Sequence, residues 1–193
     1  ESGAHVLRLR ELTMLLLHGM MERYPQRYQF DEEELRLIGD AAVMHDLGKI
    51  AIPDQILNKP GKLTPEEFAI MKTHTTQGCI LLDSVPQVRS NPVYDYAYDI
   101  CRHHHERWNG RGYPDGLAGD EISIWAQVVA LADVYDALVS ERVYKKAFSH
   151  EKAVDMILNG ECGVFNPELM ECLREMAGEM RTRYLQVRKD GKS

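Results

Sequence analysis

One segment in the middle of the chain combines histidine, acid and glycine residues at a spacing that could do chemistry. It runs from His104 to Pro114 and places two adjacent histidines and Glu106 before a glycine-rich loop that ends in Tyr113 and Pro114. Imidazole nitrogen and carboxylate oxygen are ligands for divalent metals, and long loops beside such groups commonly carry function. The segment therefore predicts a metal site, with a phosphate ester as the class of substrate.

A second pair of potential ligands lies earlier in the chain. His45 and Asp46 follow an apolar run, and Lys49 lies one helical turn further on. Because adjacent residues on a helix point about 100° apart, this pair could serve one metal at a helix end or let the aspartate bridge two metals. Together, the two motifs indicate metal-assisted hydrolysis.

The residues that we expect to converge on one site supply only nitrogen and carboxylate oxygen. They are His5, His45, Asp46, His74, His104, His105 and Asp133. So many candidates imply at least two metal ions, and iron, manganese, zinc, nickel and cobalt all suit these donors. Glu1 lies one helical turn before His5 and could add a carboxylate for a third ion.

Each candidate also has an ordinary structural interpretation. A lone histidine in a helix is usually a surface or hydrogen-bonded residue, which is the alternative for His5 and His74. Asp133 lies in an apolar helix, where a salt bridge or a cap could offset the cost of burying a carboxylate instead of a metal. The residues interpreted as ordinary, without a role as ligands, are His18, His103, His150 and Asp136.

The elements that must position these residues are predicted to be helices. Apolar residues repeat at helical spacing between segments marked by glycine and proline. This pattern predicts an all-α bundle, and 193 residues suit a single domain over the whole range 1–193. We expect about seven helices, at about 4–24, 31–48, 64–83, 92–107, 123–140, 149–160 and 167–187. The longest irregular segments, about 49–63 and 107–122, adjoin the two chemical motifs.

Three of these helices begin with capping signals. Asp31 is followed by Glu34 and Thr64 by Glu67, the spacing at which the two side chains of a capping box meet. Asn166 precedes a proline in the position of a third N-cap. These signals predict the helix starts more firmly than the apolar pattern alone.

Composition excludes several classes of function. The net charge of −7 argues against binding of long nucleic acid, although bound cations would still let the site attract a small anion. No apolar run approaches the roughly 20 residues of a membrane helix, so we expect a cytoplasmic protein without membrane contact. Since the chain starts at Glu1 instead of methionine, we also expect it to be part of a longer protein with a regulatory domain. The cysteines lack C-x-x-C spacing and are expected to be reduced and buried: Cys79, Cys101, Cys162 and Cys172.

At these motifs the chain resembles the HD-GYP family, the bacterial cyclic di-GMP phosphodiesterases built on the HD-domain metal-dependent phosphohydrolase fold. The resemblance covers nearly the whole chain and includes the segments 45–50, 104–114 and 132–138, in the family's order. It implies a helical HD-domain fold and hydrolysis of cyclic di-GMP to pGpG, to GMP or to both. Two or three divalent ions, iron or manganese first, are the implied cofactors.

The resemblance also implies roles for individual residues. Lys49 matches the residue that holds a phosphate oxygen near the metals, and Glu1 matches the extra acid of members with three metals. Tyr113 belongs to the loop that gives the family its name, which is also a potential contact for a protein partner. Arg142 and Lys145 fall where members place cationic contacts to the nucleotide. The residues that match the family's metal ligands are His5, His45, Asp46, His74, His104, His105 and Asp133.

Three positions depart from the family's pattern. Asn109 and Asn166 stand where the family commonly has aspartate, and Val143 replaces a proline. None of these changes removes a proposed ligand, so we expect an active member. In the expected mechanism, Asp46 and a water bridge two metals, the water supplies hydroxide to attack phosphorus, and Lys49 stabilises charge on the phosphoryl oxygens.

Two other functions remain open from the sequence. The same fold could hydrolyse another cyclic dinucleotide or a nucleotide, and a substrate panel would separate that activity from hydrolysis of cyclic di-GMP. Alternatively, the chain could be a receptor that binds cyclic di-GMP without turnover and passes the signal to a partner. The complete ligand set favours an enzyme.

Overall fold

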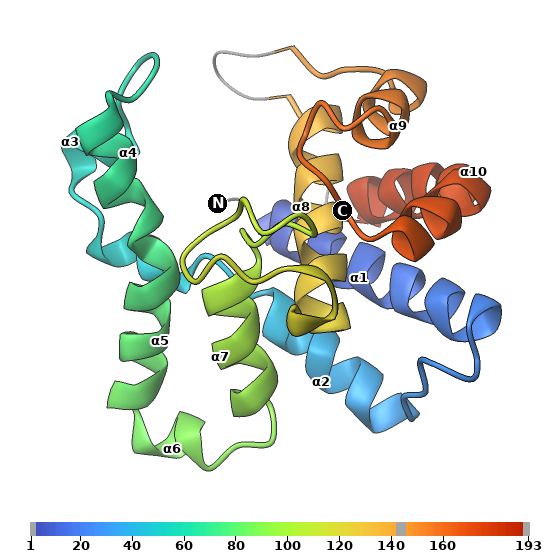
Figure 1. Ribbon diagram of the computed structural model, residues 1–193, viewed down its shortest axis with the longest axis horizontal. Helices are drawn as coiled ribbons and strands as arrows, with labels where there is room; N and C mark the ends of the chain where they lie inside the picture. The colour runs from blue at the N-terminus through green and yellow to red at the C-terminus, as the bar shows by residue number, and fades with distance from the viewer. Residues whose placement is uncertain (1–2, 142–145, 191–193) are drawn as a thin grey trace.

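The computed structural model describes residues 3–141 and 146–190. In that part of the chain the regular elements are helices, apart from an isolated antiparallel bridge between Asn109 and Ala118. In chain order they are α1 (Gly3–Arg23), α2 (Glu32–Ala42), η1 (Leu47–Ala51), α3 (Asp54–Leu57), α4 (Pro65–Lys72), α5 (His74–Ser84), α6 (Pro86–Arg89), α7 (Tyr94–His103), η2 (Gly119–Glu121), α8 (Ile124–Val139), α9 (His150–Leu158) and α10 (Pro167–Asp190) (Figure 1). The expected all-α fold is confirmed.

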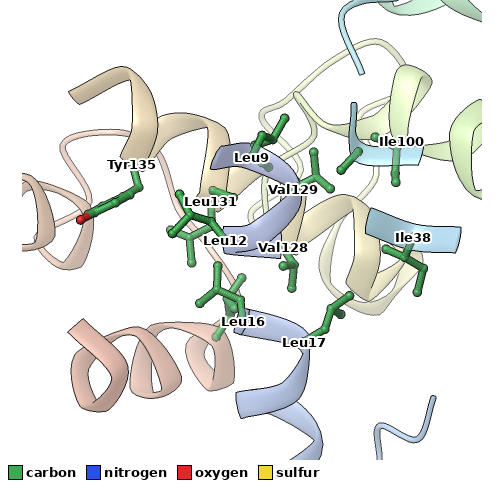
Figure 2. Close-up of a cluster of buried hydrophobic side chains, with 14 of the residues drawn as sticks. Leu9, Leu12, Leu16, Leu17, Ile38, Ile100, Val128, Val129, Leu131 and Tyr135 are labelled. Atoms are coloured by element: carbon green, nitrogen blue, oxygen red, sulfur yellow. The ribbon is translucent and has the colours of Figure 1, made fainter. Parts of the chain in front are cut away.

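Helices α1 and α8 form the centre of the core. Leu9, Leu12 and Leu16 of α1 are fully buried, as are Val128 and Leu131 of α8, and Figure 2 shows these side chains meeting between the two helices. Fully burying such a side chain stabilises the fold by roughly 1.5–3 kcal/mol. Helix α8 also contacts α7 and α9, so it is held on several sides. This packing gives α8 a fixed position from which to present a ligand.

The capping signals are confirmed where the sequence placed them. Asp31 and Glu34 form a capping box at the start of α2, and Thr64 and Glu67 form another at the start of α4. At the start of α10, the Oδ1 of Asn166 accepts a hydrogen bond of 2.9 Å from the backbone N–H of Glu168. Each cap satisfies N–H groups that the first helical turn leaves without a partner.

The prediction of a single helix at 64–83 is wrong, because the helix is interrupted at Thr73, between α4 and α5. The last carbonyl groups of α4 accept the backbone N–H of Thr73 and also bond side chains. The Thr73 hydroxyl donates to the carbonyl of Ile70 at 2.7 Å, and the imidazole of His74 bonds the carbonyl of Met71 at 2.7 Å. Such local bonds compete with the helical ones. The break lets α5 begin with His74.

Other boundaries also differ from expectation. Helix α2 ends at Ala42 and not near residue 48, so the His45 motif lies in a turn. The long irregular segments contain the short elements η1, α3 and η2, and α6 was not expected at all. In Figure 1, α3 and α4 extend away from the core formed by α1, α8 and α10.

Two expectations from composition can be compared with the described residues. None of their helices combines the length and the apolar character needed to cross a bilayer. The cysteines form no disulfide, and Cys79, Cys101 and Cys172 are buried. Cys162 is only partly buried, which corrects the expectation that all of the thiols would be shielded.

Candidate metal centre

The turn that carries His45 and Asp46 packs directly on helix α5. Gly48 allows this approach, because an added Cβ would lie 1.8 Å from the carbonyl oxygen of His74 and 2.4 Å from the backbone nitrogen of Gly78. A residue with a side chain could not occupy this position without moving η1 away from α5. The close contact brings the carboxylate of Asp46 beside the first residue of α5.

The expected ligands come together as two groups. The members of each group offer one ligand atom apiece, and these atoms all lie within 4.8 Å of one another. We call the first group the triad, which consists of His5, His45 and Asp133, and the second the quartet, which consists of Asp46, His74, His104 and His105. The seven described residues that the sequence singled out therefore lie close together. They come from α1, the α2–η1 turn, α5, the end of α7 and α8.

Asp46 lies between the triad and the quartet. Its Oδ2 is 3.0 Å from the Nε2 of His45, which belongs to the triad. Its Oδ1 is 3.3 Å from the Nε2 of His74 and 3.7 Å from the Nε2 of His104, both in the quartet. The two oxygens of one carboxylate therefore face different groups, an arrangement that suits a ligand bridging two metals.

The imidazole rings are oriented by bonds on their outer nitrogen. The Nδ1 atoms of His45, His74 and His104 lie 2.9, 2.7 and 2.8 Å from the backbone carbonyls of Ala42, Met71 and Ile100. A carbonyl only accepts hydrogen bonds, so each Nδ1 must carry the proton and each neutral ring presents the lone pair of its Nε2. Metal-binding histidines are typically held in this way. The donors therefore fit a metal centre.

Burial favours the neutral form of two quartet histidines, His74 and His105. The pKa of His74 is lowered to about 4, first by burial and then by the neighbouring His104, against the bond to the Met71 carbonyl, which raises it. The pKa of His105 is lowered as well, first by burial and then by His104 and His74. A neutral imidazole can bind a metal ion, whereas a protonated one cannot. Because the donors are nitrogen and oxygen without sulfur, they suit first-row divalent ions without selecting one of them.

The glycine-rich loop closes over one side of the quartet. The ring of Tyr113 stacks on that of His105, with centroids 4.7 Å apart and an angle of 18° between the planes. Glu106 is buried, and its Oε1 accepts hydrogen bonds from the backbone N–H groups of Asp115 at 2.7 Å and Gly116 at 3.1 Å. The loop is therefore anchored by the residue that directly follows the two ligands.

His103 belongs to neither ligand group in the described chain, as expected. Its Nδ1 lies 2.6 Å from Asp99 and its Nε2 3.0 Å from Asp115, and Arg102 donates two further bonds to Asp115. The pKa of His103 is raised, because these two carboxylates outweigh the opposing effect of burial. His103 thus fastens the loop to α7.

Two further residues near the centre, Asp136 and Arg107, were not predicted as functional. Asp136 lies 2.7 Å from the Nδ1 of His5 and also bonds Arg8. The spacing from Asp133 to Asp136 puts both on one face of α8, which was the available signal for Asp136. Arg107 is held over the ring of Phe165, 5.0 Å from its centroid, and no sequence pattern indicated this contact.

Lys49 and Lys72 bring positive charge to the edge of the centre. The Nζ of Lys49 lies 2.5 Å from the Oδ2 of Asp46. Lys72 lies over the rings of Phe68 and Tyr113, at 5.3 and 5.7 Å from their centroids. Cations at these places favour an anionic ligand beside Tyr113. The other sequence candidates, Glu1, Arg142 and Lys145, lie outside the described residues.

A profile described as an HD domain matches residues 5–169, so the chain belongs to the HD-domain family. A solved structure described as Bd1817, an HDG"Y"P protein from Bdellovibrio bacteriovorus, has a TM-score of 0.61 and 20% sequence identity, covering 87% of this chain and 51% of the other. This likeness supports the helical HD-domain fold. The resemblance drawn from the sequence motifs is confirmed.

Relatives with higher identity are named phosphodiesterases. A probable cyclic di-GMP phosphodiesterase of Vibrio cholerae serotype O1 is 40% identical over 173 residues, which cover 89% of this chain and 39% of the relative. A 3'3'-cGAMP-specific phosphodiesterase 2 of the same organism is 38% identical over 175 residues, covering 91% of this chain and 31% of the relative. The chain thus spans less than half the length of either relative.

Proposed function

We propose that this chain is a metal-dependent phosphodiesterase domain that hydrolyses cyclic di-GMP. The observation that carries the proposal is the position of Asp46, whose two carboxylate oxygens face the triad and the quartet. Two cations that share a carboxylate form a centre suited to phosphoryl transfer. The similarity to proteins named cyclic di-GMP phosphodiesterases supports the choice of substrate.

In this proposal each ligand group holds one divalent cation. The triad of His5, His45 and Asp133 holds the first, and Asp46 and the quartet histidines hold the second. Iron or manganese is the proposed metal, with zinc, nickel or cobalt as alternatives that suit the same donors. Glu1, one turn before His5, stays the proposed ligand for a third ion.

Divalent cations bound here would supply a nucleophile by lowering the pKa of a coordinated water and would withdraw charge from the phosphoryl oxygens. Lys49 is placed to donate to a phosphoryl oxygen, because its Nζ already lies beside the shared carboxylate. Burial raises the pKa of Tyr113, so its hydroxyl stays protonated and serves as a hydrogen-bond donor to the substrate. Arg142 and Lys145 remain the proposed cationic contacts to the nucleotide.

The test is metal content and turnover measured on one sample. Protein purified without oxygen would be assayed for metal by plasma mass spectrometry and for hydrolysis of cyclic di-GMP, with pGpG and GMP resolved as products. Two or three equivalents of metal with turnover is the expected result. Protein that is active while free of metal would overturn the metal centre, and metal without turnover would overturn the enzyme assignment for this substrate.

A second substrate deserves a place in the same assay. Three relatives are named 3'3'-cGAMP-specific phosphodiesterases, and one of these is 38% identical to this chain. A higher kcat/KM for 3'3'-cGAMP than for cyclic di-GMP would make 3'3'-cGAMP the proposed substrate. Tight binding of cyclic di-GMP without hydrolysis, with metal present, would favour a receptor instead.

The proposal extends to the setting of the domain. Residues 1–193 are proposed to form the catalytic domain of a longer bacterial protein that also carries a regulatory domain and acts in the cytoplasm. The loop that contains Tyr113 is the proposed contact for a protein partner, since Pro114 and Asp115 beside it are exposed.

A further inference from the structure

The Nδ1 atoms of four of the triad and quartet histidines do not all face the same kind of acceptor. In His45, His74 and His104 the Nδ1 faces a backbone carbonyl. In His5 it faces the carboxylate of Asp136 at 2.7 Å. A charged acceptor makes a stronger hydrogen bond than a neutral one and raises the basicity of the imidazole on its other nitrogen. His5 is therefore the histidine whose ligand strength depends on another side chain.

Asp136 is kept ionised by a second buried residue. The guanidinium of Arg8 donates to Asp136 from Nε at 2.5 Å and from Nη2 at 3.1 Å, and both side chains are buried. The carboxylate therefore meets His5 as an anion.

Arg8 is itself fixed by contacts away from the metal centre. Its Nη2 donates to the hydroxyl of Ser140 at 3.2 Å, and its guanidinium lies 5.3 Å from the centroid of the Tyr184 ring. The Tyr184 hydroxyl in turn donates to the carbonyl of Val139 at 3.1 Å. These contacts join α1, α8 and α10 behind His5. The orientation of the His5 ring is thus set, through Asp136 and Arg8, by packed and hydrogen-bonded neighbours.

We propose that Asp136, held by Arg8, is a positioning residue that sets the affinity of the triad for its cation through His5. The inference rests on the proposed metal centre and adds a residue to it. A simpler role, in which the Arg8–Asp136 pair only joins α1 to α8, makes a different prediction. In that case, loss of the pair would lower stability without a preference for one metal.

The experiment is a titration of Mn²⁺ into the chelator-treated full chain, with free Mn²⁺ measured by electron paramagnetic resonance. Wild-type protein should bind at least two equivalents. In Asp136→Asn, one equivalent should bind about 10–100-fold more weakly while another keeps its affinity. The matched control is Asp99→Asn, since Asp99 holds the Nδ1 of His103, which belongs to neither ligand group. This control should leave every equivalent unchanged.

A double-mutant cycle tests whether Asp136 acts through His5. His5→Ala should weaken the same equivalent, and adding Asp136→Asn to it should cause little further loss, because the path is already broken. Additive losses, or equal weakening of both equivalents, would overturn the inference. Fewer than two equivalents in the wild type would instead overturn the proposed metal centre.

A measurement on the wild type covers the case in which Asp136→Asn does not fold. With ¹⁵N-labelled histidine, His5 should carry its proton on Nδ1, and this proton should be the most deshielded among the ligand histidines because its acceptor is charged. Addition of a diamagnetic ion such as Zn²⁺ should then shift the Nε2 resonance. A proton on Nε2 of His5 in the metal-free protein would contradict the proposed positioning.

Discussion

Asp46 combines two contacts that no other described ligand candidate has. It lies between the triad and the quartet, and it also accepts a bond from Lys49 at 2.5 Å. Removal of the Asp46 carboxylate and removal of the Lys49 side chain should therefore have different effects on bound metal and turnover. In the proposed mechanism Asp46 would hold the cations, whereas Lys49 would bind the phosphate.

Replacing each residue by alanine should separate these roles. Asp46→Ala should remove most of the bound metal and abolish hydrolysis, because both groups lose a shared ligand. Lys49→Ala should keep the metal and lower kcat by roughly 10²-fold, the usual cost of losing one donor to the developing charge. Metal content and steady-state kinetics measured on both variants would check this. Full activity in Asp46→Ala would refute the centre.

Residue types and order were enough to predict which side chains lie together, because few combinations of histidine and carboxylate side chains have another use at such density. Asp136 was interpreted as an ordinary acid behind the ligands, and its contact with His5 was not predicted. Its partner His5 lies on α1, whereas Asp136 lies on α8, and sequence spacing says nothing about two helices that meet only in the folded core. The resemblance carried ligands but not the contacts behind them.

At the scale of elements, the ligand histidines lie where helices end. The rings of His45 and His104 bond the last carbonyls of α2 and α7, and His74 bonds a carbonyl of α4. Each of these carbonyls also accepts a backbone N–H, so the imidazole adds a second hydrogen bond at the end of the helix. The same bond turns the Nε2 of the ring toward the centre.

The contact of η1 with α5 predicts an intolerant glycine. Gly48→Ala should destabilise the fold by about 2 kcal/mol or more, because the new methyl group would meet the backbone of His74 and Gly78. Gly178→Ala is the matched control: it is exposed within α10, and an added Cβ meets nothing within 4 Å. That substitution should stabilise by about 0.5–1 kcal/mol. Urea unfolding would measure both, and equal effects would contradict the packing argument.

The loop depends on Glu106 in a comparable way. Glu106→Ala should leave the N–H groups of Asp115 and Gly116 without their acceptor, at a cost of about 1–3 kcal/mol, and should expose the loop to proteolysis. Glu121→Ala is the control, since Glu121 accepts from the N–H of Ala118 but is exposed. Limited proteolysis followed by mass spectrometry should show faster cleavage within 107–122 only in the first variant.

Helix starts were predictable from local chemistry, whereas two helix ends were not. Asp31 and Thr64 act within one turn of chain, so their effect is visible in sequence. At the ends at Ala42 and Lys72, carbonyl groups bond the side chains of His45, Thr73 and His74. The apolar repeat continues past both ends, so it does not mark them. The division of 64–83 into two helices was therefore missed.

At the scale of the whole molecule, helix α8 joins the metal centre to a region remote from it. Tyr135 of α8 is fully buried, and its hydroxyl lies 2.5 Å from the Nδ1 of His150 on α9. Burial raises the pKa of Tyr135, so the phenol is the donor and His150 must be neutral to accept. The stability of the bundle is therefore linked to the charge of a histidine outside the triad and the quartet.

This link predicts a pH effect. The native pKa of His150 is lowered from 6.5, first by burial, with Glu151 opposing the shift and Arg181 adding to it. The unfolded chain therefore takes up this proton at a higher pH than the native chain. The stability contributed by His150 should be complete above pH 6.5 and should decline as the pH falls below that value. His150→Gln, which cannot titrate, should remove this contribution.

Urea unfolding at pH 7.5 and pH 5.5 would measure the effect. The advantage of the wild type over His150→Gln should be smaller at pH 5.5, because only the wild type loses the His150 contribution. Other titrating groups occur in both proteins and cancel in the difference. A difference in unfolding free energy that stays constant or grows on acidification would contradict the proposed linkage.

The members of the two ligand groups are separated by very different lengths of sequence. The quartet lies within residues 46–105, whereas the triad needs both His5 and Asp133. A ribosome releases residues in order, at roughly 5–20 per second. The nascent polypeptide therefore possesses every quartet side chain for some seconds before Asp133 has been synthesised. During translation the triad is therefore completed only when α8 emerges. Until then, His5 and His45 lack the aspartate of α8 with which they would hold a cation.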